Sequence, residues 1–453
     1  MKGLESHVGG PVVKHGLDRR ATPAANTGMT AGSPQGYYAA SSETPPPRPR
    51  LTGDMRVDVC VVGGGFTGLT AALHLARAGA KVALLEAETV GFAASGRNGG
   101  QIHTGHRMSQ PELERWLGPV HAHDLWDLCE ESKALVRSQA ATLAPDAHLK
   151  DGLIIAAHDR TALRELGEDT DYLNQRYGYS SARMIGAEET HRLTGAEYLG
   201  GRLDMGGGHL HPLRYARGLA RGAEAAGATI FEHSRARSVE TEATNIAVVQ
   251  SETGKVTADF VLLATDAFSA DLAPELAPFI AHVESFISAT APLPPELNAQ
   301  ILPTDAAVAD TRHVLDYYRK SDDGRLLFAG REGYWNVPND IAPIVRKRML
   351  QVFPMLQSVP TEYAWSGTVG ITVTRLPHMG RLSPHVLFAH GYSGQGVALT
   401  SIGGKLMAEA ALGKPERFEV MARVPARRFP GGPWLRKPLV AAALFAFKIA
   451  DAF

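Results

Sequence analysis

The chain has 453 residues, a formal net charge of −1 and 44% hydrophobic residues, as expected for a globular protein of two or three domains. The near-neutral charge argues against a nucleic-acid-binding surface, because such surfaces concentrate Lys and Arg. Only two cysteines occur, Cys60 and Cys129, so neither a disulfide framework nor a cysteine metal site is expected, and the cytoplasm is the expected compartment. The longest apolar run near the C-terminus, residues 439–447, is far shorter than the roughly 20 residues of a membrane span, so stable membrane insertion is not expected.

Residues 1–50 are rich in Gly, Pro, Ser and Thr and close with PPPRPR. A segment of this composition buries little apolar surface, so we predict that it is largely disordered. Tyr37 and Tyr38 are the residues through which it could dock on the folded body. The folded chain is expected to start near Asp54.

The first glycine-rich segment follows the apolar stretch VDVCVV, residues 57–62, which predicts a β-strand. The strand runs into a turn of three glycines, Gly63, Gly65 and Gly68, and an apolar helix and a second strand ending at Glu86 follow. In such a β-turn-α-β unit the glycine turn lets the backbone approach a pyrophosphate at the helix N-terminus. Glu86 stands where an acidic side chain accepts hydrogen bonds from a ribose. This unit alone leaves NAD and FAD both open.

Two further glycine-rich segments lie at residues 94–101 and 390–397. The last segment forms a glycine turn between a predicted strand and a predicted long helix. The N-terminal dipole of that helix would stabilise negative charge at the pyrimidine end of a flavin. Between them, the apolar stretch 258–265 predicts a buried strand of a parallel sheet. A cofactor contacted by N-terminal, middle and C-terminal segments favours FAD in a discontinuous domain over NAD in a contiguous one.

We therefore predict an α/β fold, with a discontinuous Rossmann-like FAD-binding domain and a substrate domain built on a mainly antiparallel sheet. The expected division is a disordered N-terminal extension at 1–50, an FAD-binding domain at 54–109, 193–278 and 375–415, a substrate domain at 110–192 and 279–374, and a C-terminal extension at 416–453. Helices are expected at 125–143, 160–175 and 213–226.

Several motifs carry a family resemblance: VDVCVVGGGFTGL, GFAASGRNGGQ, GGGHLHP, LDYYR, GYSGQGV and FPGG. With them the chain resembles the flavoprotein amine oxidases of the D-amino-acid-oxidase/sarcosine-oxidase superfamily, and within it the bacterial γ-glutamylputrescine oxidoreductases. The likeness extends from about residue 37 to residue 438.

The resemblance implies a role for each segment in holding FAD. The pyrophosphate would lie on Gly63, Gly65, Thr67 and Gly68, and the ribose on Glu86. The ribityl chain and the isoalloxazine would lie along Ser95, Gly96, Arg97, Asn98, Gly99, Gly100 and Gln101. Adenine would meet the backbone at Ala236 and at the turn of Ala264, Thr265 and Asp266. The pyrimidine end would be covered by Gly391, Tyr392, Ser393, Gly394, Gln395, Gly396 and Val397, with Gln395 standing where a histidine is expected.

The implied reaction is oxidation of an amine C–N bond in a γ-glutamylputrescine-like substrate. The imine would be hydrolysed to an aldehyde and ammonium, and the flavin would be reoxidised by oxygen, giving peroxide, or by another acceptor. Tyr318, Trp335 and Gln395 are the catalytic candidates, and Tyr317 and Trp365 are further candidates for an aromatic wall that desolvates the amine. FAD is expected to be noncovalent, because residues 94–101 contain neither His nor Cys.

Two alternatives stay open at this point. One is an FAD enzyme acting on another secondary amine or amino acid, such as sarcosine, a D-amino acid or a proline-like compound. The other is a flavin-binding subunit without catalysis. His209 and His211 could share one face of a strand, but no carboxylate or cysteine stands beside them at a ligand spacing, so no metal is predicted.

Overall fold

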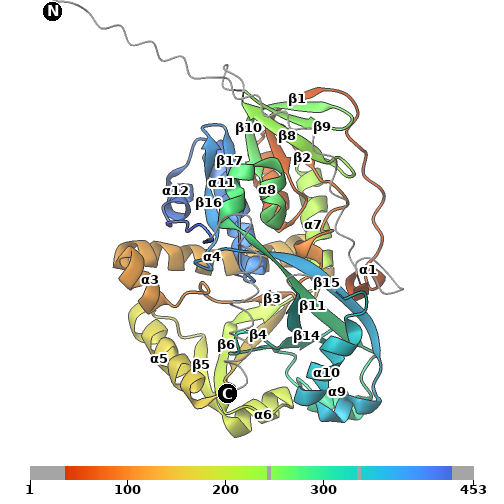
Figure 1. Ribbon diagram of the computed structural model, residues 1–453, viewed down its shortest axis with the longest axis vertical. Helices are drawn as coiled ribbons and strands as arrows, with labels where there is room; N and C mark the ends of the chain where they lie inside the picture. Colours follow the sequence, from red (N-terminus) through yellow and green to blue (C-terminus); the bar gives the residue numbers. More distant parts are fainter. Residues whose placement is uncertain (1–35, 242–245, 334–337, 431–453) are drawn as a thin grey trace, which may run out of the picture.

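The computed structural model describes residues 36–241, 246–333 and 338–430 (Figure 1). Two β-sheets, one in the upper and one in the lower part of Figure 1, organise the molecule, and helices pack on both. The α/β fold with two sheets is confirmed. Residues 1–35 and 431–453 of the two predicted extensions lie outside the described residues.

The first sheet has eight strands, with β16, β17, β10, β1, β2 and β7 side by side and with β8 and β9 joined to β10. Their bounds are β1 (Met55–Val62), β2 (Val82–Leu85), β7 (Thr229–Phe231), β8 (Ala236–Thr241), β9 (Ala247–Ser251), β10 (Lys255–Leu263), β16 (His378–Ser383) and β17 (Val386–His390). Val62 pairs in parallel with both Leu85 and Leu263, and Leu263 pairs in parallel with Phe388. The carboxyl ends of four strands from distant parts of the chain therefore meet at one edge.

Four helices share a single apolar core with the first sheet. They are α2 (Phe66–Arg77), α4 (Pro119–Leu143), α7 (Pro212–Ala225) and α11 (Gly396–Ala411). The position of α4 differs from the predicted division, which assigned residues 110–192 to the substrate domain. Leu125, Cys129 and Val136 follow one face of α4 and are buried in this core. Helix α12 (Glu416–Ala422) of the predicted C-terminal extension also packs here, through Phe418.

The second sheet has nine strands in the order β15, β11, β14, β13, β12, β4, β6, β3, with β5 paired to β6. Their bounds are β3 (Gln101–Ile102), β4 (Lys150–Ala156), β5 (Ala182–Gly186), β6 (Gly200–His209), β11 (Ala281–Thr290), β12 (Ala307–Asp310), β13 (Tyr317–Lys320), β14 (Leu326–Gly333) and β15 (Thr361–Ile371). Its described pairs are antiparallel apart from β4 with β12. The predicted division placed residues 193–278 in the FAD-binding domain, and within that range β6 pairs with β3, β4 and β5 of this second sheet.

The remaining elements are short connections, helices on the second sheet, and helix α3 (Gln110–Leu117), which packs on α4. The others are α1 (Gly36–Ala40), η1 (Ala94–Gly96), η2 (Pro145–Ala147), α5 (Arg160–Tyr177), α6 (Ala187–Thr194), η3 (Asp266–Phe268), α8 (Ser269–Leu272), η4 (Pro274–Phe279), α9 (Pro295–Gln300), α10 (Ala342–Val352) and η5 (Pro354–Ser358).

Residues 36–50, here named the N-terminal strap, run along the outside of both sheets and differ from the predicted disorder. Tyr37 and Tyr38 are 2% and 0% exposed. Farther along, Arg48 pairs with Glu224 of α7 at 2.6 Å. Two aromatic anchors and a half-buried ion pair therefore fix a segment whose average composition is polar.

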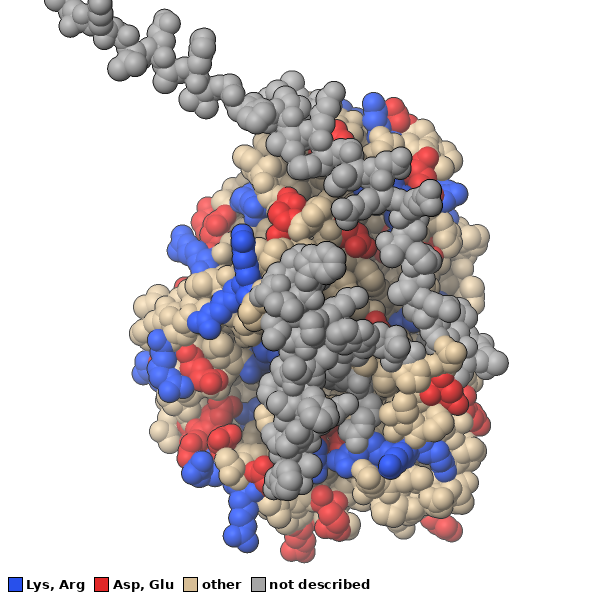
Figure 2. Space-filling view, viewed as in Figure 1, with Lys and Arg blue, Asp and Glu red and all other residues tan. Residues whose placement is uncertain are grey.

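The described residues include no helix that is both long and apolar enough to cross a membrane. On the face seen in Figure 2, basic and acidic side chains are interspersed, and neither sign covers a large continuous area of the described surface.

Candidate cofactor site

Three loops leave the carboxyl edge of the first sheet, and we name them in chain order: the first loop (63–68), the second loop (94–101) and the third loop (390–397). In the first loop, Gly63 has φ 112°, and a Cβ there would lie 2.5 Å from the carbonyl oxygen of Ala264. A Cβ at Gly68 would overlap the Gly63 carbonyl, and one at Gly65 would lie 2.8 Å from Ser95 Oγ. The turn is thus bare backbone at the N-terminus of α2, a cradle that fits a pyrophosphate.

Glu86 directly follows β2 and lies half-buried against the first loop. Its Oε2 accepts a hydrogen bond from the Gly64 amide at 2.6 Å, and its Oε1 accepts one from the Glu88 amide at 2.9 Å. Burial raises the pKa of Glu86 above its ordinary value, and the two amide donors oppose that rise. The carboxyl group therefore stands beside the glycine turn, where we expect the ribose to lie.

Glu86→Gln is expected to weaken FAD binding by roughly 10- to 100-fold, because a hydrogen bond to a charged group contributes about 1.5–3 kcal/mol. The FAD dissociation constant of the purified protein measures the effect. Glu88→Gln is the matched control, since the Glu88 side chain lies at the surface and pairs with Arg235 at 2.9 Å. Equal FAD affinity in the two variants would show that Glu86 is not the ribose acceptor.

The second loop is held in shape by its own side chains. Ser95 Oγ accepts from the Phe66 amide at 3.0 Å, which ties this loop to the first turn of α2. Asn98 Nδ2 donates to the carbonyls of Ala94 and Ser95 at 2.9 and 3.0 Å. Asn98 Oδ1 accepts from the Gly100 amide at 2.7 Å. The Asn98 side chain therefore fixes the backbone conformation of the second loop.

Arg97 and Gln101 tie the second loop to its surroundings. Arg97 donates from Nε to the Phe92 carbonyl at 2.7 Å and from Nη1 to the Ser366 carbonyl of β15 at 3.2 Å. Gln101 Nε2 donates to the Val308 carbonyl of β12 at 2.8 Å. Polar side chains that were predicted to line the cofactor thus serve to clamp the loop between the two sheets. The glycine backbone of the loop is where we expect the ligand to lie.

The third loop adopts a left-handed backbone at Gly391, Ser393 and Gly394, with φ of 76°, 54° and 90°. The Gly391 amide donates to Asp266 Oδ1 at 2.8 Å, which joins this loop to the end of β10. At the N-terminus of α11, Gln395 Oε1 is buried without a hydrogen-bond partner among the described residues. An unpaired buried acceptor at this place fits a contact with a bound polar group.

Asp266, predicted only as the end of a turn that meets adenine, is a structural residue of this region through its side chain. Burial raises its pKa, and amide donors that include those of Gly391 and Gly370 oppose the rise. The available signal was a carboxylate directly after an apolar parallel strand.

Direct contacts join the loops at this edge. Thr67 Oγ1 donates to the Tyr392 hydroxyl at 3.0 Å, connecting the first and third loops. The Ser234 amide donates to the Glu86 carbonyl at 2.8 Å, so Ala236, two residues later at the start of β8, lies close to the expected ribose position. The predicted residues brought to this region are Gly63, Gly65, Thr67, Gly68, Glu86, Ser95, Gly96, Arg97, Asn98, Gly99, Gly100, Gln101, Ala236, Ala264, Thr265, Gly391, Tyr392, Ser393, Gly394, Gln395, Gly396 and Val397.

The adjacent tyrosines of β13 lie on opposite faces of the second sheet. A Cβ at Gly99 would lie 2.6 Å from Tyr317 Cε2, so the Tyr317 ring packs on the second loop. Its hydroxyl shares a hydrogen bond with Ser285 Oγ at 2.9 Å. Tyr318 is 1% exposed and stacks on Phe328 in the core behind the sheet. The structure therefore brings Tyr317, and not the catalytic candidate Tyr318, to the loops.

Of the two tryptophan candidates, the structure describes only Trp365. Trp365 is buried beneath the N-terminal strap, and its Nε1 donates to the Arg97 carbonyl at 2.9 Å, so it supports the second loop from behind. Trp335 lies outside the described residues.

His209 and His211 have protein partners of their own. His209 Nε2 donates to the Asp305 carbonyl at 2.7 Å, and His211 Nε2 shares a hydrogen bond with Ser41 Oγ at 3.0 Å. Burial lowers the pKa of His209 to about 3 and that of His211 well below its ordinary value, so both rings are neutral at pH 7. Within the described ranges, no group of three or more His, Cys, Asp and Glu is placed to hold a metal.

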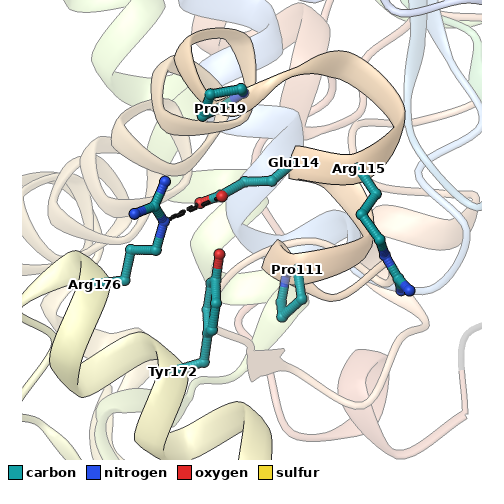
Figure 3. Close-up of a pocket in the computed structure, with 6 residues that line it drawn as sticks. All are labelled: Pro111, Glu114, Arg115, Pro119, Tyr172 and Arg176. Atoms are coloured by element: carbon teal, nitrogen blue, oxygen red, sulfur yellow. Dashed lines mark hydrogen bonds and ion pairs between the residues drawn. The ribbon is translucent and has the colours of Figure 1, made fainter.

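A solvent-facing pocket of about 470 Å³ lies away from the three loops, between α3, the start of α4 and α5 (Figure 3). Glu114 and Arg176 form an ion pair across it at 2.9 Å, and Tyr172 lies beside them. None of its lining residues belongs to the predicted cofactor site.

The fold and the three loops are those of an FAD-dependent oxidoreductase. The sequence model of the family described as "DAO: FAD dependent oxidoreductase" matches residues 58–410, and the chain belongs to this family.

Two curated relatives match almost end to end. A "Probable oxidoreductase OrdL" of Rhizobium meliloti (strain 1021) is 38% identical over 419 residues, which cover 92% of this chain and 97% of the relative. The "Gamma-glutamylputrescine oxidoreductase" of Escherichia coli (strain K12) is 35% identical over 418 residues, again 92% of this chain and 97% of the relative.

Solved structures agree in fold. Glycine oxidase from Geobacillus kaustophilus superposes with a TM-score of 0.68 at 22% identity, covering 79% of this chain and 95% of that one. L-proline dehydrogenase from P. horikoshii gives 0.68 at 19% identity, covering 82% and 99%.

Proposed function

We propose that the protein uses FAD to oxidise the C–N bond of an amine, and that its substrate is a γ-glutamylated diamine such as γ-glutamylputrescine. The similarity to the E. coli γ-glutamylputrescine oxidoreductase, at 35% identity across nearly the whole of both chains, is the observation that carries this proposal. Product release as aldehyde and ammonium, and oxygen as the electron acceptor, are parts of the same proposal.

FAD, when bound, accepts the two electrons of the oxidation, and the protein supplies binding and orientation. The first loop and Glu86 would hold the pyrophosphate and ribose. The N-terminus of α11 would face the pyrimidine end, where its dipole stabilises negative charge. The Tyr317 ring beside the second loop would form part of the wall that favours the neutral amine.

FAD is proposed to be held without a covalent bond. Cys60 and Cys129 are both buried in apolar cores, on β1 and α4. The second loop contains neither histidine nor cysteine. Acid or heat denaturation is therefore expected to release the flavin from the polypeptide.

Two arginines in or beside the second loop bear on the choice between an acylated diamine and an amino acid, because each already donates to groups of the protein. An amino-acid substrate carries a carboxylate next to the reacting amine, and a buried arginine is the usual partner for such a group. Arg319 is buried beside the second loop, but all three of its nitrogens donate within the protein, to two backbone carbonyls and a tyrosine hydroxyl. Arg97 gives Nε and Nη1 to carbonyls in the same way.

A substrate panel under anaerobic conditions tests the proposal. The purified flavoprotein is mixed with γ-glutamylputrescine, sarcosine or D-alanine, and loss of the oxidised flavin absorbance is followed in time. γ-Glutamylputrescine is expected to reduce the flavin fastest. Reduction by sarcosine or D-alanine but not by γ-glutamylputrescine would overturn the substrate proposal. A different result would indicate a flavin-binding subunit without amine turnover: dithionite reduces the flavin, but no amine of the panel does.

A further inference from the structure

The N-terminal strap and strand β13 meet on one guanidinium group. Arg319 Nε donates to the Gly99 carbonyl of the second loop at 2.7 Å, and Nη1 donates to the Lys320 carbonyl at 3.0 Å. Nη2 donates to the hydroxyl of Tyr38 in the strap at 3.1 Å. These contacts join the LDYYR motif to the second loop and to the strap, in which Tyr38 lies 281 residues away in the sequence.

This guanidinium is buried and all its hydrogen-bond acceptors are neutral. Arg319 is 4% exposed, and Tyr38 is fully buried beside it, with the guanidinium carbon 5.7 Å from the Tyr38 ring centre. A buried charge needs acceptors for its donors, and here two carbonyls and a phenol, none of them charged, accept from three of the five N–H groups. After burial, the charge of Arg319 is the next cause that lowers the pKa values of His209 and His211. Its positive field therefore acts on its neighbours.

The strap supports the second loop at another point as well. A Cβ at Gly36 would lie 2.6 Å from the Trp365 ring, so the strap backbone packs flat on that indole. Trp365 in turn donates from Nε1 to the Arg97 carbonyl at 2.9 Å. The loop carbonyls of Arg97 and Gly99 are both held by side chains that the strap covers.

We propose that Tyr38 and Arg319 are positioning residues for the flavin. The strap holds the guanidinium on the Gly99 carbonyl, which fixes the second loop and keeps beside it a positive charge whose described hydrogen-bond acceptors are neutral. Since a positive charge near the isoalloxazine stabilises its reduced, negatively charged form, Arg319 raises the flavin reduction potential. The inference rests on FAD lying along the second loop, and it is independent of which amine is oxidised.

The neighbouring tyrosine provides the matched control. Tyr37 lies in the same short helix and is equally buried, but its hydroxyl donates to Asp323 at 2.7 Å, away from the second loop. Tyr37→Phe and Tyr38→Phe each remove one hydroxyl from the strap, and both are expected to lower the thermal midpoint. Only Tyr38→Phe removes an acceptor from Arg319.

The first readout is the rate at which diluted holoenzyme releases FAD, followed by flavin fluorescence. Tyr38→Phe is expected to release FAD about 5- to 10-fold faster than the wild type, the scale of one ordinary hydrogen bond, because the lost bond acts on the flavin only through Arg319. Tyr37→Phe is expected to leave the rate unchanged.

The second readout is the flavin midpoint potential, measured by reduction against a reference dye without any amine. Arg319→Met is expected to lower the potential. Arg319→Lys keeps the charge and is expected to hold the potential near the wild-type value, while FAD release still accelerates because lysine lacks the fork of donors.

Equal release rates for Tyr37→Phe and Tyr38→Phe, or a wild-type potential in Arg319→Met, would overturn the proposal. If Arg319→Met fails to fold, the FAD release rates of Tyr37→Phe and Tyr38→Phe still test the proposal. Because no substrate is used, failure of the amine proposal would leave both readouts intact.

Discussion

Gly68→Ala is expected to yield a protein that retains no FAD through purification. Gly68 lies in the first turn of α2, and a Cβ there would overlap the Gly63 carbonyl and stand 3.2 Å from Val61 Cγ1. Gly63 cannot move aside, because its φ of 112° and the Ala264 carbonyl on its other side hold it in place. The start of α2 must therefore shift away from β1, which moves the amides that would face the pyrophosphate. Overpacking of this kind costs about 1–3 kcal/mol in ordinary cores, and more where a rigid backbone must move.

The ratio of flavin absorbance to polypeptide after gel filtration measures this effect. Gly167→Ala in α5 is the matched control, since it is also a helical glycine and its Cβ would meet no atom within 4 Å. That control is expected to bind FAD normally and to stabilise α5 by about 0.5–1 kcal/mol. A Gly68→Ala protein with the wild-type flavin content would contradict the assignment of the first loop as the pyrophosphate cradle.

The first loop could be predicted because its signal is local. The strand, the glycines, the helix and Glu86 lie within about thirty residues, and each has a conformational requirement that its own sequence displays. The third loop was also recognisable, since glycines between an apolar strand and an apolar helix leave few alternatives. Asp266 joins it to β10 through a contact across 125 residues, and such pairing has no local signal.

The faces of the second sheet could not be read from the sequence. In LDYYR, two tyrosines follow each other, so one must face the loops and the other the opposite core, and a shift of one residue exchanges them. The register of β13 with β14, in which Tyr318 pairs with Phe328, determines which tyrosine faces the loops. That register depends on contacts across the sheet, and the sequence interpretation selected Tyr318 without access to them.

The N-terminal strap shows the limit of composition as a guide. Averaged over residues 1–50, the segment is too polar to fold by itself. The folded body, however, offers a complete site for Tyr38 in Arg319, His211 and Trp365. Order in residues 36–50 therefore depends on a surface formed elsewhere in the chain, and an average over fifty residues conceals two buried tyrosines.

Replacing each tyrosine of β13 by alanine is expected to give two different results. Tyr318→Ala should lower stability, and Tyr317→Ala should slow flavin reduction. Tyr318 stacks on Phe328 with ring centres 5.6 Å apart and meets Phe353 edge-on at 5.1 Å, so its removal leaves a cavity in the core behind the second sheet. Tyr318→Ala is expected to lower the free energy of unfolding by about 3–5 kcal/mol, as large aromatic truncations do. Denaturant unfolding measures this loss.

Tyr317→Ala is expected to have the opposite profile, with little loss of stability and flavin reduction by the amine slowed on the order of 10- to 100-fold. The half-buried ring packs on Gly99, and its hydroxyl is held by Ser285, so its removal opens the wall beside the second loop and lets the substrate shift. A misplacement of about 1 Å can cost a hundredfold in rate. Stopped-flow reduction under saturating amine measures the chemical step, and the flavin absorbance of the resting protein verifies that FAD remains bound.

Tyr318→Ala, assayed at a temperature where it is fully folded, should keep the wild-type reduction rate. A slow Tyr318→Ala together with an unaffected Tyr317→Ala would restore the original sequence assignment and would mean that the substrate does not lie on the face of the sheet that carries Tyr317.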